Sequence, residues 1–95
     1  MPEQKIISIG LPVKDEEDSL PRTLKRLLEQ RTPGYEKEII VCLNGSNKET
    51  TKIAREFASQ HREIVLIETP IAGKSRAWNL IRARAKSDVI VFCDA

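Results

Sequence analysis

The stretch that decides the fold is Val89-Ile90-Val91-Phe92-Cys93-Asp94-Ala95, where five apolar residues lead into a single carboxylate. A run this short is too brief for a typical helix, and its unbroken apolar character is typical of a parallel strand buried on both faces. Ligands of open α/β sheets bind beyond the carboxyl ends of such strands, so we expect Asp94 to lie where the chemistry takes place. Domain boundaries normally fall in exposed linkers, so we expect residues 1–95 to be the N-terminal portion of a longer domain.

Three more apolar runs precede this stretch. The four runs together predict strands over residues 5–11, 38–43, 63–68 and 89–93. Pro12 follows the first run, and because proline lacks a backbone N–H we expect it to end that strand's hydrogen-bonded ladder. Apolar residues repeat at helical spacing in each of the three connections, which predicts a helix between every pair of successive strands.

The expected helices have recognisable start signals. The first begins near Ser19, a residue type favoured at the N-cap. The second begins at the turn of residues 44–47, where Ser46 and Glu49 have capping-box spacing, and the third covers residues 74–86. The order β-α-β-α-β-α-β predicts an α/β fold: a three-layer, Rossmann-like half with four parallel strands in the order 3-2-1-4.

Charge and cysteine content narrow the class of protein. Sixteen basic residues against fourteen acidic ones give a net charge of +2, and their interspersed pattern argues against a nucleic-acid partner. Cys42 and Cys93 have no closely spaced partners, so we expect reduced thiols in a cytoplasmic protein. No apolar run approaches the roughly 18 residues of a membrane span, and membrane association of the longer protein stays open.

Residues with chemical potential follow the expected strands at their carboxyl ends. They are Pro12, Val13, Lys14 and Glu16 after the first strand, Asn44 after the second, Lys74 after the third and Asp94 after the fourth. A cation suits a diphosphate, an amide suits the edge of a base, and a carboxylate can hold ribose or a divalent metal. Because the order 3-2-1-4 makes strands one and four neighbours, the loop after the first strand and Asp94 are expected to flank one crevice.

Four segments in the correct order resemble motifs of family 2 glycosyltransferases with the GT-A fold. Residues 7–17 (ISIGLPVKDEE) resemble the family's first strand, which ends in a proline and an x-x-N-E-E turn. Residues 38–46 (EIIVCLNGS) resemble its second strand, commonly E-I-I-V-V-D-D-G-S. Residues 73–79 (GKSRAWN) resemble its G-K-x-x-A-x-N helix start, and residues 89–95 resemble the strand leading into the D-A-D form of its D-x-D motif.

The resemblance implies an enzyme that moves a sugar from a nucleotide diphosphate donor, expected to be UDP-linked, to an unknown acceptor. The residues implied to bind the nucleotide are Pro12, Val13, Lys14, Glu16, Asn44, Lys74 and Asp94. Of these, the residues after the first strand would line the nucleoside, Asn44 would face the base and Lys74 would lie near the nucleotide. Asp94 would approach the ribose and a divalent metal, Mg²⁺ or Mn²⁺.

Three departures from the family pattern bear on activity. Asp15 replaces the usual asparagine and Asn44 the usual aspartate, which leaves the base preference open, although an amide can accept a hydrogen bond from a uracil N–H. The sequence also stops before the second aspartate of D-x-D and before the family's catalytic base. One carboxylate holds a divalent ion weakly, so we expect no transferase turnover from these residues alone.

Two other functions compete with this interpretation. Gly73-Lys74-Ser75 after a strand is reminiscent of a P-loop, but the first glycine of that motif would fall at Glu68, whose carboxylate repels phosphate. A non-catalytic nucleotide-binding or interaction module with the same fold is the more serious alternative. The fourth strand is also an apolar edge in the order 3-2-1-4, so we expect self-association through residues 89–93.

Overall fold

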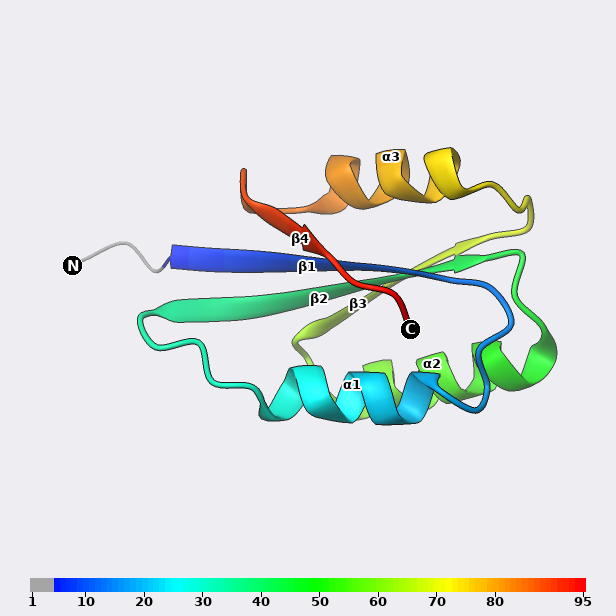
Figure 1. Ribbon diagram of the computed structural model, residues 1–95, viewed down its shortest axis with the longest axis horizontal. Coiled ribbons are helices and arrows are strands. Elements are labelled where there is room, and N and C mark those ends of the chain that lie inside the picture. Colours follow the sequence, from blue (N-terminus) through cyan, green and yellow to red (C-terminus); the bar gives the residue numbers. More distant parts are fainter. Residues whose placement is uncertain (1–4) are drawn as a thin grey trace.

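The computed structural model describes residues 5–95 (Figure 1). The elements are β1 (Lys5–Val13), α1 (Leu20–Glu29), β2 (Tyr35–Asn44), α2 (Lys48–Gln60), β3 (Ile64–Thr69), α3 (Lys74–Arg84) and β4 (Ile90–Phe92). The strands form one parallel sheet in the order β3-β2-β1-β4, which confirms the predicted topology. The expected domain begins at residue 1, and its residues 1–4 lie outside the described part. None of the helices described is long and apolar enough to cross a membrane.

The sheet is the middle of three layers. Figure 1 shows α1 and α2 on one face and α3 on the other. Because side chains alternate along a strand, neighbouring residues of β2 enter different cores: Ile39 and Val41 pack under α1 and α2, while Ile40 packs with Ala77 and Ile81 of α3. All seven residues from 38 to 44 are therefore buried, as expected for a central parallel strand.

The prediction that Pro12 ends the first ladder is wrong. β1 remains paired with β2 through Val13, and Pro12 lies opposite Cys42. Alternate residues of a parallel strand direct their backbone groups to the same neighbour, and the Gly10 carbonyl accepts a hydrogen bond from Cys93 N–H on the β4 side. Pro12 is two residues further along, beyond the last β1–β4 pair, so its missing N–H interrupts no ladder.

The helix starts differ in part from expectation. Ser19 occupies the N-cap of α1, but its hydroxyl donates to Glu16 Oε2 at 2.9 Å instead of capping the helix. Ser46 was expected to cap the second helix, and this is wrong, because Asn47 is the N-cap and its Oδ1 accepts from Thr50 N–H at 2.9 Å. The Ser46 hydroxyl instead donates to the carbonyl of Val13 at 3.0 Å.

The expectation that the fourth strand is buried on both faces is also wrong. β4 has three residues, and its central Val91 is 48% exposed. Val91 lies opposite Ile9 and so faces the α1–α2 side of the sheet, at an edge that neither helix covers fully. Ile90 and Phe92 point to the other face and pack with the core beneath α3.

A buried polar cluster joins β1 and β2 to the turn between α3 and β4, at the end of the sheet away from the carboxyl ends of the strands. The Ser8 hydroxyl donates to Glu38 Oε2 at 2.7 Å, and the same oxygen accepts from the backbone N–H of Lys86 at 3.0 Å. The backbone N–H of Ser87 donates to Ser8 Oγ at 3.3 Å. These bonds attach the turn between α3 and β4 to the first two strands and so help to set the position of β4.

Gly10 allows α3 and β4 to pack closely on β1. A Cβ atom at this position would lie 2.8 Å from Ile81 Cγ2 and 3.0 Å from a Phe92 ring carbon. We predict that Gly10→Ala lowers the free energy of unfolding by about 1–3 kcal/mol, the usual cost of overpacking a core, as measured by urea denaturation. Gly73→Ala is the matched control, because its nearest contact would be an ordinary 3.7 Å, and it should change stability by less than about 0.5 kcal/mol. Equal losses in the two variants would contradict the packing argument.

Candidate functional site

The carboxyl ends of the four parallel strands lie at one rim of the sheet. The loops that leave β1, β2 and β3 gather at the right-hand end of the sheet in Figure 1. β1 and β4 are neighbours, so the loop after Val13 and the chain after Phe92 leave adjacent strands. Polar residues from four separate segments are therefore carried on one side of the molecule, where ligands of such sheets bind.

Hydrogen bonds join the loop after β1 to the start of α2. The hydroxyl of Thr50, which is fully buried, accepts from the backbone N–H of Glu16 at 3.1 Å and donates to Glu17 Oε2 at 3.2 Å. Asn47 donates from its side-chain amide to the same Glu17 oxygen at 3.1 Å, and its backbone N–H donates to Asp15 Oδ1 at 2.9 Å. Because these four hydrogen bonds join them, the loop after β1 and the start of α2 form one rigid unit.

This unit places negative charge at the N-terminus of α2. The amide of Asn47, the backbone N–H of Glu17 itself and the hydroxyl of Thr50 hold the pKa of Glu17 below its usual value, because each donates to the charged carboxylate. Asp15 binds the backbone N–H of the N-cap residue. The positive end of this helix dipole is thus already compensated by carboxylates of the protein.

Asn44 connects the loop after β2 to the start of α3. Its side chain is 9% exposed, and Oδ1 accepts from the backbone N–H of Gly73 at 2.8 Å. The next residue, Gly45, donates its N–H to the Thr69 carbonyl at 2.9 Å and has a φ of +67°. An added Cβ there would approach Ala72 N to 3.3 Å, so glycine lets the two loops lie close together.

Lys74 lies at the start of α3 beside two aromatic rings. Its Nζ is 5.6 Å from the centroid of the Trp78 ring, a distance at which the ring attracts a cation. Trp78 stacks in turn on Phe92 of β4, with centroids 5.0 Å apart. Lys74 at the start of α3 is thus linked through the Trp78 ring to the end of β4, and Trp78 itself is 36% exposed.

The remaining predicted site residues differ in accessibility. Val13 is 2% exposed and belongs to the core under α1 and α2, Pro12 is half-buried, and Lys14 is exposed. Asp94 is exposed too, and within residues 5–95 no hydrogen bond or ion pair joins it to another side chain. The structure thus joins Glu16, Asn44 and Lys74 to neighbouring residues through contacts. Asp94 follows β4, which is paired with β1, and so lies beside the end of β1.

The donor set does not make a metal site by itself. No group of three or more His, Cys, Asp or Glu side chains in the described residues could hold a metal ion. Asp94 offers a single exposed carboxylate. A divalent cation here would need most of its oxygen ligands from a bound phosphate group and from water, as Mg²⁺ often does.

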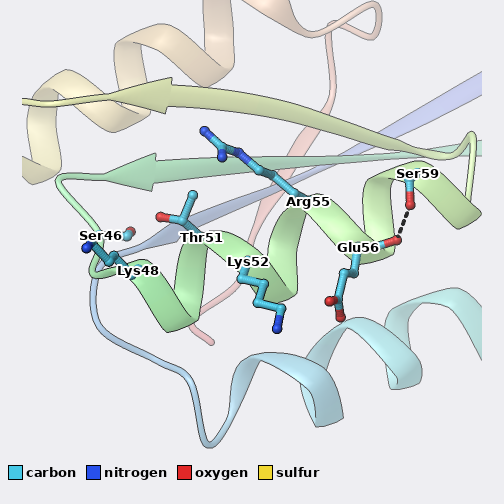
Figure 2. A pocket seen from close by; sticks show the side chains of 7 residues that line it. All are labelled: Ser46, Lys48, Thr51, Lys52, Arg55, Glu56 and Ser59. Carbon is cyan, nitrogen blue, oxygen red and sulfur yellow. Dashed lines mark hydrogen bonds between the residues drawn. The ribbon is translucent and has the colours of Figure 1, made fainter.

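Two cavities lie next to the rim loops but away from Asp94. The larger, about 560 Å³, runs along α2 and is lined by Ser46, Lys48, Thr51, Lys52, Arg55, Glu56 and Ser59 (Figure 2). The smaller, about 370 Å³, lies beside Gly45, Ser46 and Pro70. Neither is lined by residues 12–16 or by Asp94, so the predicted crevice between β1 and β4 stays a prediction.

Arg55 closes one side of the cavity on α2. Its guanidinium binds the Glu68 carboxylate through two hydrogen bonds, of 2.7 and 3.2 Å, and this contact raises the pKa of Arg55. Both side chains are largely exposed, so the pair contributes little to stability. Because Arg55 is paired with Glu68 of the edge strand β3, its charge is neutralised there and it is not a free cation in the cavity.

The sequence interpretation missed Thr50 and Asn47, which hold the β1 loop in place. A signal for Thr50 was present, because it lies four residues before Ala54 and so on the inner face of the same helix. A hydroxyl on an otherwise buried helix face needs a hydrogen-bond partner, and the nearest candidates are the acidic residues after β1.

Comparison with known proteins shows related glycosyltransferases. The chain is 34% identical over 91 residues to the 4,4'-diaponeurosporenoate glycosyltransferase of Staphylococcus haemolyticus, covering 94% of this chain and 24% of that protein. It is 28% identical over 89 residues to the glycosyltransferase AglE of Haloferax volcanii, covering 93% of this chain and 29% of that protein. The chain therefore spans about a quarter of the length of these curated relatives.

A solved structure shares the fold. The mannosyltransferase PcManGT of Pyrobaculum calidifontis, in complex with GDP-Man and Mn²⁺, matches 97% of this chain with a TM-score of 0.85 and 23% identity. The match covers 28% of that protein.

The family model of glycosyl transferase family 2 matches residues 8–95, which is nearly all of the chain. The matched segment includes the β1 loop, Asn44, the start of α3 and Asp94. The four motifs in the sequence, the order of the sheet and this match agree, and the chain belongs to glycosyl transferase family 2.

Proposed function

We propose that this chain is the N-terminal nucleotide-sugar-binding portion of a glycosyltransferase that moves a sugar from a nucleotide diphosphate donor to an acceptor. The observation that carries the proposal is the adjacency of β1 and β4, which sends the β1 loop and Asp94 out of neighbouring strands at one rim. The family match over residues 8–95 supports the same assignment. The chain's own part in the reaction is to bind and orient the donor, through Pro12, Val13, Lys14, Glu16, Asn44, Lys74 and Asp94.

The charges at the two helix starts support a location for the diphosphate. Asp15 and Glu17 compensate the N-terminus of α2 and would repel a phosphate there. The first turn of α3 has no acidic residue and carries Lys74 and Arg76. An anion is favoured at a helix N-terminus of this second kind, so the diphosphate is proposed to lie at the start of α3.

The contact of Asn44 with Gly73 bears on the base. The backbone N–H uses one of the two lone pairs of Oδ1, and the side-chain NH₂ still has both of its hydrogens to offer a ligand. A donor suits a base that has a ring carbonyl, as uracil and guanine do and adenine does not. We therefore propose a uridine or guanosine diphosphate sugar, with uridine the expected base, and the GDP-Man complex of the structural neighbour supports this class.

A divalent cation is proposed to bind together with the donor. The structural neighbour was solved with Mn²⁺, and Asp94 is a carboxylate at the rim of this chain that could contribute one ligand. When bound, such an ion would neutralise phosphate charge. A single carboxylate does not form a complete site, so phosphate oxygens and water would supply the other ligands.

The cysteines support a cytoplasmic location. Cys42 and Cys93 are both free, and burial raises the pKa of the Cys42 thiol, which keeps it protonated and unreactive. Free thiols are typical of a reducing compartment.

Nucleotide binding is the direct test. Calorimetry with Mn²⁺ should show heat for UDP or GDP and none for ADP at the same concentrations. Asp94→Asn should weaken binding about tenfold, the effect expected of losing one charge-assisted contact, whereas Asp88→Asn, an exposed acid on the opposite rim, should leave it unchanged. No heat with any nucleotide at millimolar concentration would favour a non-catalytic interaction module.

The β1 loop should depend on the Thr50 hydroxyl. We predict that Thr50→Val lowers the free energy of unfolding by about 1–3 kcal/mol, because it leaves the Glu16 N–H without its acceptor and removes a donor to Glu17. It should also weaken UDP or GDP binding, while Thr50→Ser restores most of both. Thr51→Val, one residue along the same helix, is the control and should change neither. If Thr50→Val left nucleotide binding unchanged, the β1 loop would not be part of the nucleotide site.

Self-association through residues 89–93 is proposed as well. Val89 and Val91 are 66% and 48% exposed, and β4 is an edge strand with an unpaired side in the described structure. Sedimentation should reveal a concentration-dependent dimer, which Val91→Lys abolishes and Lys5→Gln, on the side of β1 away from the rim, does not. A monomer at all concentrations would refute this.

A further inference from the structure

A series of side-chain contacts runs from the sheet to the first turn of α3. The ring of Phe92 occupies the space over Gly10, where an added Cβ would lie 3.0 Å from a ring carbon. The Trp78 ring stacks on Phe92, with centroids 5.0 Å apart and an angle of 28° between the ring planes. Lys74 Nζ lies 5.6 Å from the centroid of the Trp78 ring. The series therefore begins at the central part of β1 and ends in a cation at the start of α3.

The sequence spacing brings Lys74 and Trp78 together. They are four residues apart, so they lie one above the other on the same side of α3. This side faces β4, because Trp78 stacks on Phe92. Lys74 is exposed, so a ligand can reach its ammonium group while the ring holds it.

The contact with the ring leaves the hydrogen-bonding capacity of Lys74 unused. An ammonium group has three N–H donors, and within residues 5–95 Nζ of Lys74 donates to no protein oxygen and pairs with no carboxylate. A free lysine side chain has large rotamer entropy. A contact that already restricts this side chain lowers the cost of ordering it on a ligand.

We propose that Trp78 is a positioning residue for the sugar-nucleotide donor, because its ring holds the Lys74 ammonium ready for the diphosphate. The inference rests on the proposed function, which puts the diphosphate at the start of α3. The stack on Phe92, the last residue of β4, also fixes this side of α3 against the strand that leads to Asp94. Trp78 thus acts through Lys74 and is not itself a contact of the donor.

The alternative role of a pair at this spacing is to stabilise the helix alone. In that case nucleotide binding would not depend on the ring once the chain is folded. If the ring positions the ammonium, its effect on binding must instead disappear when Lys74 is removed. The two roles therefore predict different results in a double-mutant cycle.

The cycle uses the full chain with Mn²⁺ and either UDP or GDP, whichever the wild type binds more tightly in calorimetry. Trp78→Leu should weaken binding about two- to fivefold, the range expected of an exposed cation–π contact. In the Lys74→Met background the same change should have no further effect. Trp78→Phe keeps an aromatic ring and should restore most of the affinity.

Tyr35→Leu is the matched control. Lys5 Nζ lies 5.8 Å from the centroid of the Tyr35 ring, and these two residues begin β1 and β2 at the end of the sheet opposite the rim. Removing this second ring should leave nucleotide binding unchanged. A readout without ligand is the NMR spectrum, in which the Trp78 ring should shift the side-chain protons of Lys74 upfield in the wild type and not in Trp78→Leu.

The outcomes separate this inference from the proposed function. No binding of UDP or GDP by the wild type would overturn the proposed function itself. If the wild type binds, the positioning role alone would be overturned by an unchanged affinity in Trp78→Leu, by equal losses with and without Lys74, or by an equal loss in Tyr35→Leu. Unshifted Lys74 protons in the wild type would overturn it without any variant.

Discussion

The arrangement of the rim depends on the absence of a side chain at Gly10. Ile81 of α3 and Phe92 of β4 both occupy the space where a Cβ would lie, at 2.8 and 3.0 Å. α3 can therefore pack directly on the sheet, and β4 can pair with β1 at its side. The position of Lys74 at the start of α3 and that of Asp94 just after β4 both follow from this one close approach. Even a single added methyl group would push both elements outward.

The two helices that start at the rim differ in electrostatic character although they follow similar strands. The β1 loop places Asp15 and Glu17 at the start of α2. Asp15 accepts from the backbone N–H of the N-cap Asn47, and Glu17 accepts from the side chains of Asn47 and Thr50. α3 receives only the neutral side chain of Asn44, which accepts from Gly73. The same loop network that makes the first start rigid and negative thus leaves the second as the place on the rim suited to an anion. α3 also carries two basic residues, Arg82 and Arg84, in its last turn.

The sequence predicted the fold nearly completely because its signals were local and strong. Apolar runs and intervening amphipathic segments set the element order, and the right-handed crossover rule then left few possible topologies. The errors came from context that a single residue does not reveal. Pro12 could remain in a strand because its nitrogen faces a side without a ladder partner. Asn47 is the cap instead of Ser46 because the Ser46 hydroxyl donates to the Val13 carbonyl. Val91 is exposed because no helix fully covers its edge of the sheet. The site was only partly predictable, because Thr50 contacts Glu16 and Glu17, which precede it in the sequence by 34 and 33 positions.

The central position of β1 affects how the chain folds during synthesis. β1 is made first, yet the bond between Ser8 and the Ser87 backbone joins residues 79 positions apart. At about 5–20 residues per second, the ribosome needs roughly 4–16 s to supply that partner. During this interval β2 can already pair with one side of β1, while Ser8, Ile9 and Gly10 have no strand on their other side. The nascent chain therefore exposes an apolar strand edge to the crowded ribosome exit region, where a chaperone or the chain's own later segments must reach it before a neighbouring polypeptide does.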